Sequence, residues 1–317
     1  MRFCRTFIVL ILLCITLNVH GQGDLKRLTS PNRPKIGLAL GGGGAKGAAE
    51  VGVLKALEEE GLKFDFIAGT SIGSIIGALY SCGYRALDIE KLFLSQSWIS
   101  LLTDLGSTKN RESRKSKKLR NKEDSSDGFS IGGLGLSHGD QLIALFDSLT
   151  GKTEPMQFDK LPIPFRCVAT ELRTQEPVVM SEGLLSVALR ASMSIPGMFK
   201  PVHLNGYTLV DGGMQNNLPV DVVRDMGAEY VITIDLTINK HKPRSFSLKE
   251  TFGIGGLLDW FISRPDWAQY DANVKASDMY INPILDGFDT IDFQRDKIEK
   301  MIEIGYQTAK KELKKYR

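Results

Sequence analysis

Histidine and cysteine are scarce in this chain, which has four of each among 317 residues. Cys4 and Cys14 lie in an apolar N-terminal stretch, which leaves Cys82 and Cys167, each in apolar surroundings. We expect these two to be buried free thiols rather than a disulfide. No cysteines and histidines are grouped at the spacing of a metal site. The sequence therefore gives no reason to expect a metal or another cofactor.

The N-terminal apolar run is too short to span a bilayer comfortably. It extends from Phe7 to Leu17 and follows Arg2 and Arg5, a pattern typical of a secretory signal peptide. Small or tolerated residues at 19–21 favour cleavage there, so we expect residues 1–21 to be a signal peptide. An uncleaved membrane anchor is the alternative. Either reading predicts an exported protein that is periplasmic, secreted or peripheral to a membrane.

A strong net charge is also missing, since the formal charge is +3. The segment 109–122 nevertheless holds eight basic residues against one acidic residue, Glu112. A nucleic-acid-binding protein usually spreads basic charge over a folded face, so we expect no nucleic-acid partner. Because 109–127 has almost no apolar residue, we predict a mobile basic loop. This loop is either a plain solvated loop or a functional one that contacts anionic lipid headgroups.

The rest of the chain alternates between apolar strands and helices. Residues 22–34 are polar and contain proline, which indicates a linker. Residues 35–40 are predicted to form a strand, 48–60 a helix and 64–68 a second strand. Such alternating units build parallel sheets with right-handed crossovers. We therefore expect an α/β fold with a single large domain over residues 35–317.

The sequence Gly69-Thr70-Ser71-Ile72-Gly73 follows the second of these strands and precedes an apolar helix. A serine flanked by glycines at a strand-to-helix turn is typical of a nucleophile elbow, in which the hydroxyl is raised clear of the sheet. The pentapeptide also occurs by chance in ordinary glycine-rich turns, so it needs support from elsewhere in the chain.

A glycine run, 41–47, lies between the first strand and the first helix. Gly42, Gly44 and Gly47 fit a dinucleotide fingerprint, but the second strand lacks the acidic residue that would hold a ribose. A phosphate-binding P-loop is excluded because Gly47, not serine or threonine, follows Lys46. The remaining interpretation is an oxyanion hole formed by successive backbone N–H groups, with positive potential from Lys46.

A serine nucleophile needs a base. His241 follows Ser71 and Asp211 in the chain order of an α/β-hydrolase triad, but it lies in a polar run between lysines. Asp211, in Asp211-Gly212-Gly213, could instead act alone if it is held against Ser71 and shielded from water. A simple turn aspartate is the structural alternative.

Three motifs carry a family resemblance: the glycine run 41–47, the elbow 69–73 and Asp211-Gly212-Gly213. Together with the segment 190–196 (Arg-Ala-Ser-Met-Ser-Ile-Pro), they resemble the motifs of the bacterial patatin-like phospholipases. The resemblance is close over residues 35–235 and looser beyond them. It implies a three-layer α/β/α sandwich with a mostly parallel central sheet. It further implies a catalytic dyad of Ser71 and Asp211. The implied oxyanion block is Gly42, Gly43, Gly44 and Lys46, and the supporting glycines are Gly47, Gly69, Gly73, Gly212 and Gly213.

The function implied by the resemblance is a serine lipid acyl hydrolase of the phospholipase A or lysophospholipase type. Its partner would be a phospholipid or lysophospholipid substrate, with peripheral membrane contact through 109–122 and no bound metal. Two alternatives stay open: a Ser-His-Asp esterase that uses His241, and a non-catalytic lipid-binding protein with the same fold. The sequence leaves the oligomeric state open.

Overall fold

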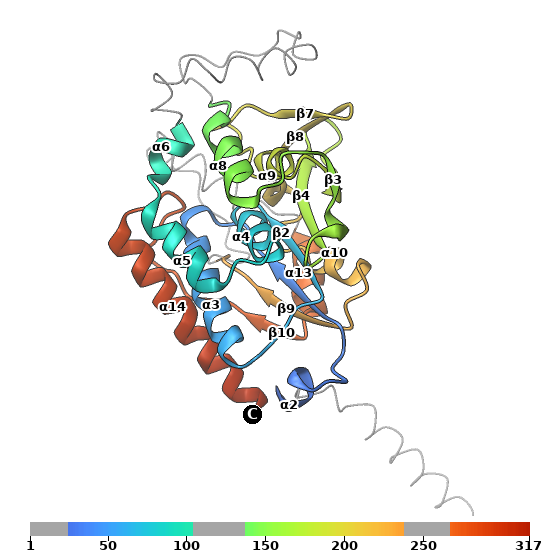
Figure 1. Ribbon diagram of the computed structural model, residues 1–317, viewed down its shortest axis with the longest axis vertical. Helices are drawn as coiled ribbons and strands as arrows, with labels where there is room; N and C mark the ends of the chain where they lie inside the picture. Colours follow the sequence, from blue (N-terminus) through green and yellow to red (C-terminus); the bar gives the residue numbers. More distant parts are fainter. Residues whose placement is uncertain (1–24, 104–136, 238–266) are drawn as a thin grey trace, which may run out of the picture.

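A computed structural model describes residues 25–103, 137–237 and 267–317 (Figure 1). Its main sheet has eight strands, seven of them in the order β10-β9-β1-β2-β4-β8-β7, with β5 also paired to β4. Strands β10, β9, β1, β2 and β4 run parallel, whereas β8, β7 and β5 are antiparallel to their neighbours. Their bounds are β1 Ile36–Leu40, β2 Phe66–Thr70, β4 Phe165–Glu171, β5 Pro177–Met180, β7 Val202–Leu204, β8 Tyr207–Asp211, β9 Tyr230–Ile234 and β10 Met279–Ile281.

Helices cover both faces of this sheet. The α-helices are α2 Leu25–Thr29, α3 Ala48–Glu59, α4 Ile72–Ser81, α5 Ala86–Ser95, α6 Trp98–Thr103, α8 Asp140–Thr150, α9 Leu185–Ser192, α10 Val220–Asp225, α13 Trp267–Ala276 and α14 Arg295–Leu313. Short 3₁₀ turns are η1 Gly44–Gly47, η4 Phe158–Lys160, η5 Gly212–Met214 and η6 Lys314–Tyr316, and a small second sheet pairs β3 Met156–Gln157 with β6 Glu182–Gly183.

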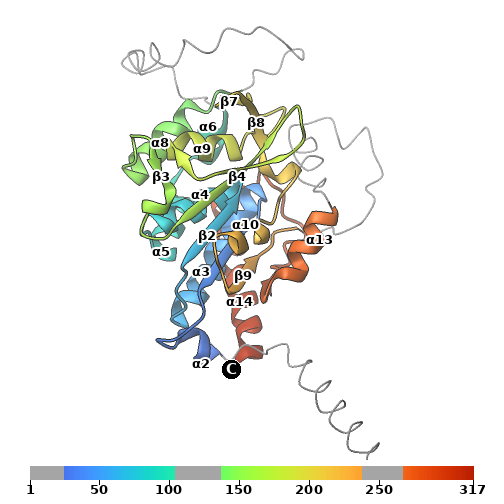
Figure 2. The same ribbon diagram turned by 90° about the vertical axis from the view of Figure 1, so that its right-hand side faces the viewer.

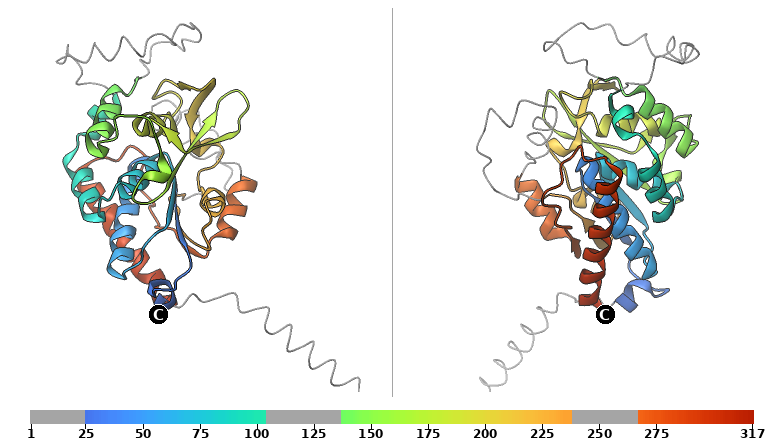
Figure 3. Two further views of the ribbon diagram at one scale, coloured as in Figure 1. Left: turned by 45° about the vertical axis from the view of Figure 1, so that its right-hand side comes forward. Right: turned by 90° about the vertical axis from the view of Figure 1, so that its left-hand side faces the viewer.

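The alternation of side chains along each strand creates two separate cores. Ile36, Leu38 and Leu40 of β1 point into the larger core with α3, α4, α5 and α14. Ala39 faces the other way and joins the core beneath α10 and α13. Figure 3 shows these two helical layers on opposite sides of the sheet. The expected three-layer α/β/α sandwich with a mostly parallel sheet is confirmed.

Helices α3 and α14 touch through glycine. A Cβ atom added at Gly52 would lie 1.9 Å from the Ile302 carbonyl oxygen, and one added at Gly305 would lie 1.9 Å from the Ala49 oxygen. The two backbones therefore pack directly against each other. Because α3 follows η1 without a break, this contact also supports the glycine run that precedes it.

Two antiparallel strands, β7 and β8, form a hairpin at the end of the molecule remote from the C-terminus (Figure 2). Its turn consists of Asn205 and Gly206, whose φ angles are 52° and 82°. Positive φ at both central residues is the requirement of the tight hairpin turn that best matches strand twist. The hairpin extends the sheet beyond β4 and ends at Asp211.

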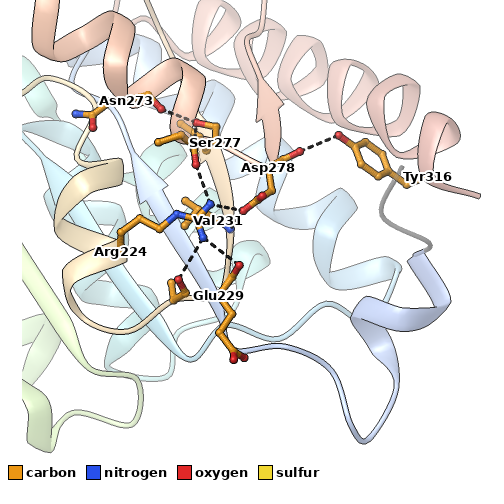
Figure 4. Close-up of polar contacts among 10 residues, drawn as sticks. Arg224, Glu229, Val231, Asn273, Ser277, Asp278 and Tyr316 are labelled. Carbon is orange, nitrogen blue, oxygen red and sulfur yellow. Dashed lines mark hydrogen bonds and ion pairs between the residues drawn. The ribbon is translucent and has the colours of Figure 1, made fainter. Parts of the chain in front are cut away.

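At the start of β9, Arg224 of α10 ties several elements together (Figure 4). Its guanidinium donates to backbone oxygens before β9 and at the end of α13, and it forms an ion pair with Asp278. Asp278 also accepts the Val231 N–H at 2.7 Å, and its carbonyl accepts the Tyr316 hydroxyl at 3.2 Å. This network fixes the N-terminal end of β9, opposite the strand ends discussed below.

Part of the segment expected to be a linker is structured. Residues 25–29 form α2, because Leu25 and Leu28 find apolar surface in the larger core. Cys82 and Cys167 are both free thiols, as expected, although Cys82 is only half-buried. The predicted signal peptide, the basic loop 109–127 and His241 lie outside the described residues.

Within the three described ranges, no helix combines the length and apolar character needed to cross a bilayer. The same ranges contain no group of three or more histidine, cysteine, aspartate or glutamate side chains arranged to bind a metal.

Candidate active site

Ser71 occupies the turn between β2 and α4 with φ 53° and ψ −122°. L-residues rarely adopt this region, so the surrounding structure must enforce it. The flanking glycines permit the necessary close packing. A Cβ at Gly69 would lie 2.4 Å from the Gly73 oxygen, and one at Gly73 would lie 2.6 Å from the Leu40 oxygen. The turn therefore has the geometry expected of a nucleophile elbow.

Hydrogen bonds with two other serines hold the backbone of Ser71. Its N–H donates to Ser192 Oγ at 2.9 Å, and that hydroxyl donates to the Val168 oxygen at 2.5 Å. Ser74 Oγ donates to the Ser71 carbonyl at 2.6 Å. Ser192 thus anchors the elbow to α9 and β4. Its position within the motif segment 190–196 was the only sequence signal for this role.

Asp211 lies at the end of β8 and meets Ser71 directly. Ser71 Oγ donates to Asp211 Oδ2 at 2.8 Å, and the Gly213 N–H donates to Asp211 Oδ1, also at 2.8 Å. Each of the two side chains belongs to a residue that is only 4% exposed. Burial raises the pKa of Asp211 to about 6, although the bonds from Gly213 and Ser71 oppose this shift. A carboxylate with a raised pKa is suited to accept a proton near neutral pH.

The sheet brings together two residues that are far apart in sequence. Strand β2, which ends beside Ser71, pairs with the first half of β4, and the second half of β4 pairs with β8. Ala169 lies opposite Asp211 in this register. Among the described residues, the side chain that accepts the hydrogen bond of the Ser71 hydroxyl is a carboxylate.

The described histidines lie elsewhere. His203 is on the edge strand β7, where its ring contacts the Thr208 hydroxyl at 3.2 Å. His138 is exposed, and its backbone oxygen accepts a bond from Arg190 at 2.9 Å. His241 cannot be placed, because it lies outside the described residues.

The glycine run lies directly against the elbow. A Cβ at Gly42 would be 3.2 Å from Ser71 Cβ. The Gly42 N–H, however, donates to the Asn217 oxygen at 3.2 Å, so this predicted oxyanion donor is already engaged. The N–H groups of Gly43 and Gly44 have no acceptor among the described residues. The candidate oxyanion donors are therefore the N–H groups of Gly43 and Gly44.

The remaining residues of the motifs act mainly in packing. A Cβ at Gly47 would lie 2.4 Å from an Ile72 side-chain carbon, and one at Gly212 would lie 2.3 Å from the Val168 oxygen. Lys46 is on η1 with a partly exposed side chain. Gly47 thus lets η1 approach the start of α4, and Gly212 lets the end of β8 approach β4.

A small apolar cavity of about 30 Å³ opens over Ser71. It lies between the elbow, the glycine run, α6, the segment after α9 and the turn before α14. Besides Ser71, its lining consists of Gly44, Ile72, Ile75, Trp98, Leu102, Met193, Ile195, Met198, Thr290, Ile291 and Phe293. This environment favours an apolar group beside the serine hydroxyl.

Glu50, in the first turn of α3, is a buried acid that the sequence analysis did not single out. It is fully buried, and its carboxyl oxygens have no hydrogen-bond partner among the described residues. Burial raises the pKa of Glu50 well above its ordinary value; the Gly41 backbone opposes this shift, and the Asp235 charge adds to it. Its spacing of four residues from Leu54 and seven from Leu57 could have indicated a buried position.

Arg190 of α9 is a buried cation close to the site. Its guanidinium donates to Ser194 Oγ at 2.6 Å and to the Lys200 oxygen at 3.0 Å, and it lies 4.3 Å from the centre of the Phe199 ring. The Ser194 backbone oxygen in turn accepts the Asp211 N–H at 3.0 Å. Arg190 therefore organises the segment that holds the backbone of Asp211.

Comparison with known proteins shows which family the chain resembles. The family model described as patatin-like phospholipase matches residues 38–224. Patatin-like phospholipase domain-containing protein 6 of Homo sapiens is 31% identical over 303 residues, which cover 87% of this chain and 20% of that protein. Lysophospholipase nte1 of Aspergillus fumigatus is 30% identical over 315 residues, which cover 93% of this chain and 19% of that protein. The chain thus spans about a fifth of the length of these relatives.

Solved structures give the same result for the fold. The crystal structure of VipD from Legionella pneumophila aligns with a TM-score of 0.51 at 15% identity, covering 91% of this chain and 68% of that one. The family model matches more than half of the chain and includes the glycine run, the elbow and Asp211. On this basis the chain belongs to the patatin-like phospholipase family.

Proposed function

We propose that this protein is a serine lipid acyl hydrolase of the phospholipase A or lysophospholipase type. The observation that carries the proposal is the 2.8 Å hydrogen bond from Ser71 Oγ to Asp211 Oδ2 beside an apolar cavity. The names of the relatives, a phospholipase domain protein and a lysophospholipase, support a lipid ester as the substrate.

In the first step, Ser71 Oγ attacks the ester carbonyl carbon as its proton moves to Asp211 Oδ2. The carbonyl oxygen gains negative charge, which the Gly43 and Gly44 N–H groups stabilise. The tetrahedral intermediate then collapses. The alcohol or lysophospholipid leaves with the proton from Asp211, and an acyl ester remains on Ser71.

In the second step, water attacks the acyl carbon and gives its proton to the same carboxylate. The second tetrahedral intermediate releases the fatty acid, and the proton returns to Ser71. Asp211 thus serves as base and acid in turn. The apolar cavity favours the acyl chain, because a hydrocarbon gains free energy when it leaves water.

Two further parts of the proposal derive from the sequence. We propose that the protein is exported and that segment 109–122 binds anionic lipid headgroups. Vesicles containing phosphatidylglycerol should then bind the intact protein less strongly at high salt. They should also bind less after deletion of 109–122, and equal binding in both comparisons would refute this role.

The dyad can be tested with Ser71→Ala and Asp211→Asn. Hydrolysis of p-nitrophenyl butanoate should fall at least about 10⁴-fold for the first variant and about 10²- to 10⁴-fold for the second. Ser181→Ala and Asp225→Asn serve as matched controls, because neither side chain touches the site. Full activity of Asp211→Asn would reject the dyad.

Two additional measurements separate the alternatives. The rate should be unchanged in His241→Ala, whereas a large loss would favour a Ser-His-Asp triad. A fluorophosphonate should label Ser71 in the wild type and leave Ser71→Ala unlabelled. Absence of labelling together with absence of turnover would favour a non-catalytic lipid-binding protein.

A further inference from the structure

Two cavities lie on either side of a single pair of aromatic rings. The cavity over Ser71 has a volume of about 30 Å³, and a second cavity of about 350 Å³ lies between the end of α5, the start of α6 and the start of α14. Trp98 and Phe293 line both cavities. These two side chains therefore separate the cavities.

The indole of Trp98 is held firmly in this position. Its ring stacks on Phe293 with centroids 5.8 Å apart and planes 27° apart. The Phe93 ring centroid is 5.0 Å away, and the indole Nε1–H donates to the Phe93 oxygen at 2.9 Å. Trp98 is only 3% exposed, so it forms a packed wall rather than a surface side chain.

Phe293 is positioned by the tight turn that precedes α14. Its N–H donates to the Ile291 oxygen at 2.8 Å. Asp292, next to it, accepts the Asp289 N–H at 2.8 Å and forms an ion pair with Lys297. The ring can therefore move only if this turn or its own rotamer changes.

The volumes of the cavities bear on chain length. A site for one water needs about 10–15 Å³ by this measure, so the cavity over Ser71 has room for only a short acyl chain. The second cavity has a volume within the range of about 300–1,000 Å³ that is typical of ligand pockets, but it is an open groove on the surface. Besides apolar residues, its lining includes the polar residues Ser95, Gln96, Ser97 and Arg295. A long acyl chain that starts at Ser71 must pass the two rings to reach it.

We propose that Trp98 and Phe293 limit the acyl-chain length of the substrate. This inference rests on the proposed acyl hydrolase function. Short chains end at the wall without disturbing it. Long chains have to displace the stacked rings, so the wild type hydrolyses them with a penalty that removal of either ring relieves.

The test compares hydrolysis of p-nitrophenyl butanoate and p-nitrophenyl hexadecanoate in the same detergent micelles. We expect the ratio of kcat/KM for the long ester to that for the short ester to rise at least tenfold in Trp98→Ala and Phe293→Ala. Trp98→Phe keeps a ring in the wall and should stay within threefold of the wild-type ratio. Trp267→Ala is the matched control, because Trp267 packs on Tyr270 and lines neither cavity.

A second readout does not depend on turnover. Fluorophosphonates with an ethyl or a dodecyl chain should label Ser71 at rates whose ratio shifts in the same direction in both alanine variants. Because the two rings belong to different elements, one of these variants can report even if the other unfolds.

The outcomes distinguish this inference from the proposed function. If the wild type hydrolyses the short ester but neither folded alanine variant changes the ratio, the wall is rejected while the hydrolase function stands. If the wild type neither hydrolyses an ester nor reacts with a fluorophosphonate, both are rejected. An equal rise of the ratio in Trp267→Ala would also overturn the assignment of the wall.

Discussion

Ser71 has a backbone conformation that favours glycine, with φ 53°. Such a conformation costs an L-residue about 1–3 kcal/mol, whereas glycine loses about 0.4–1 kcal/mol through the greater freedom of its unfolded chain. We therefore expect Ser71→Gly to unfold at a higher temperature than Ser71→Ala by about 2 °C. Calorimetry of the two inactive variants checks this. A lower melting temperature for Ser71→Gly would show that the elbow is not strained.

Asp211 predicts the pH dependence of the reaction. As the proposed base it must be ionised, and burial raises its pKa to about 6. Activity should therefore fall as the pH decreases through about 6, with kcat/KM approaching a tenfold loss per pH unit below that value. The measurement is a kcat/KM profile for a short ester between pH 4.5 and 8. A profile that stays flat down to pH 4.5 would contradict the assignment.

Glu50 predicts the pH dependence of stability. Its folded-state pKa lies above the unfolded-state value, so the stability it contributes at low pH is lost as the pH rises toward the folded-state pKa. One such group changes the free energy of unfolding by up to about 1.4 kcal/mol per pH unit. We expect the wild type to lose more stability between pH 5 and 8.5 than Glu50→Gln does, because this interval begins just above the ordinary pKa of a glutamate.

Urea unfolding at the two pH values provides this comparison. Each variant is compared with itself, so any fixed cost of burying the glutamine amide cancels. Asp211 is present in both proteins, so its titration contributes equally to both losses. Equal losses in the two proteins would mean that Glu50 is not a buried neutral acid.

At the scale of elements, the contact between α3 and α14 depends on the absence of side chains. A Cβ at Gly305 would lie 1.9 Å from the Ala49 oxygen, so alanine would push the helices apart. We expect Gly305→Ala to lower the free energy of unfolding by about 1–3 kcal/mol, typical of overpacking, despite the better helix propensity of alanine.

The matched control is Gln307→Ala on the exposed side of α14, which should change stability by less than about 0.5 kcal/mol. Gly305→Ala should also reduce esterase activity, because α3 follows directly from the glycine run. A variant as stable as the control would show that the two helices can separate without cost.

The elements also show how far local sequence patterns reach. Period-2 and period-3.6 patterns, together with glycines at fixed spacing, predicted the elbow, the glycine run and the block Asp211-Gly212-Gly213. These features are local, so they could be predicted directly from the amino-acid sequence. The engagement of the Gly42 N–H by Asn217 could not be predicted, because it depends on how β1 meets a segment some 175 positions later.

At the scale of the whole molecule, the layered fold followed from the alternation of strands and helices, but the strand order did not. Asp211 comes close to Ser71 because β8 lies next to β4 in the sheet. The cavity and its aromatic wall likewise combine residues from α6 and from the turn before α14. No sequence window contains both Trp98 and Phe293, so tertiary packing alone reveals their contact.

The β7–β8 hairpin has a consequence for how the length of this domain can vary among related chains. Successive residues of a strand face opposite sides of the sheet. If one residue were gained or lost between Tyr207 and Asp211, Ser71 would therefore face a sequence neighbour of Asp211 instead of the carboxylate. The turn at Asn205 and Gly206 lies outside that count, and additions there leave the position of the carboxylate unchanged. Natural insertions should therefore collect at the hairpin tip, while the five residues of β8 keep a fixed length.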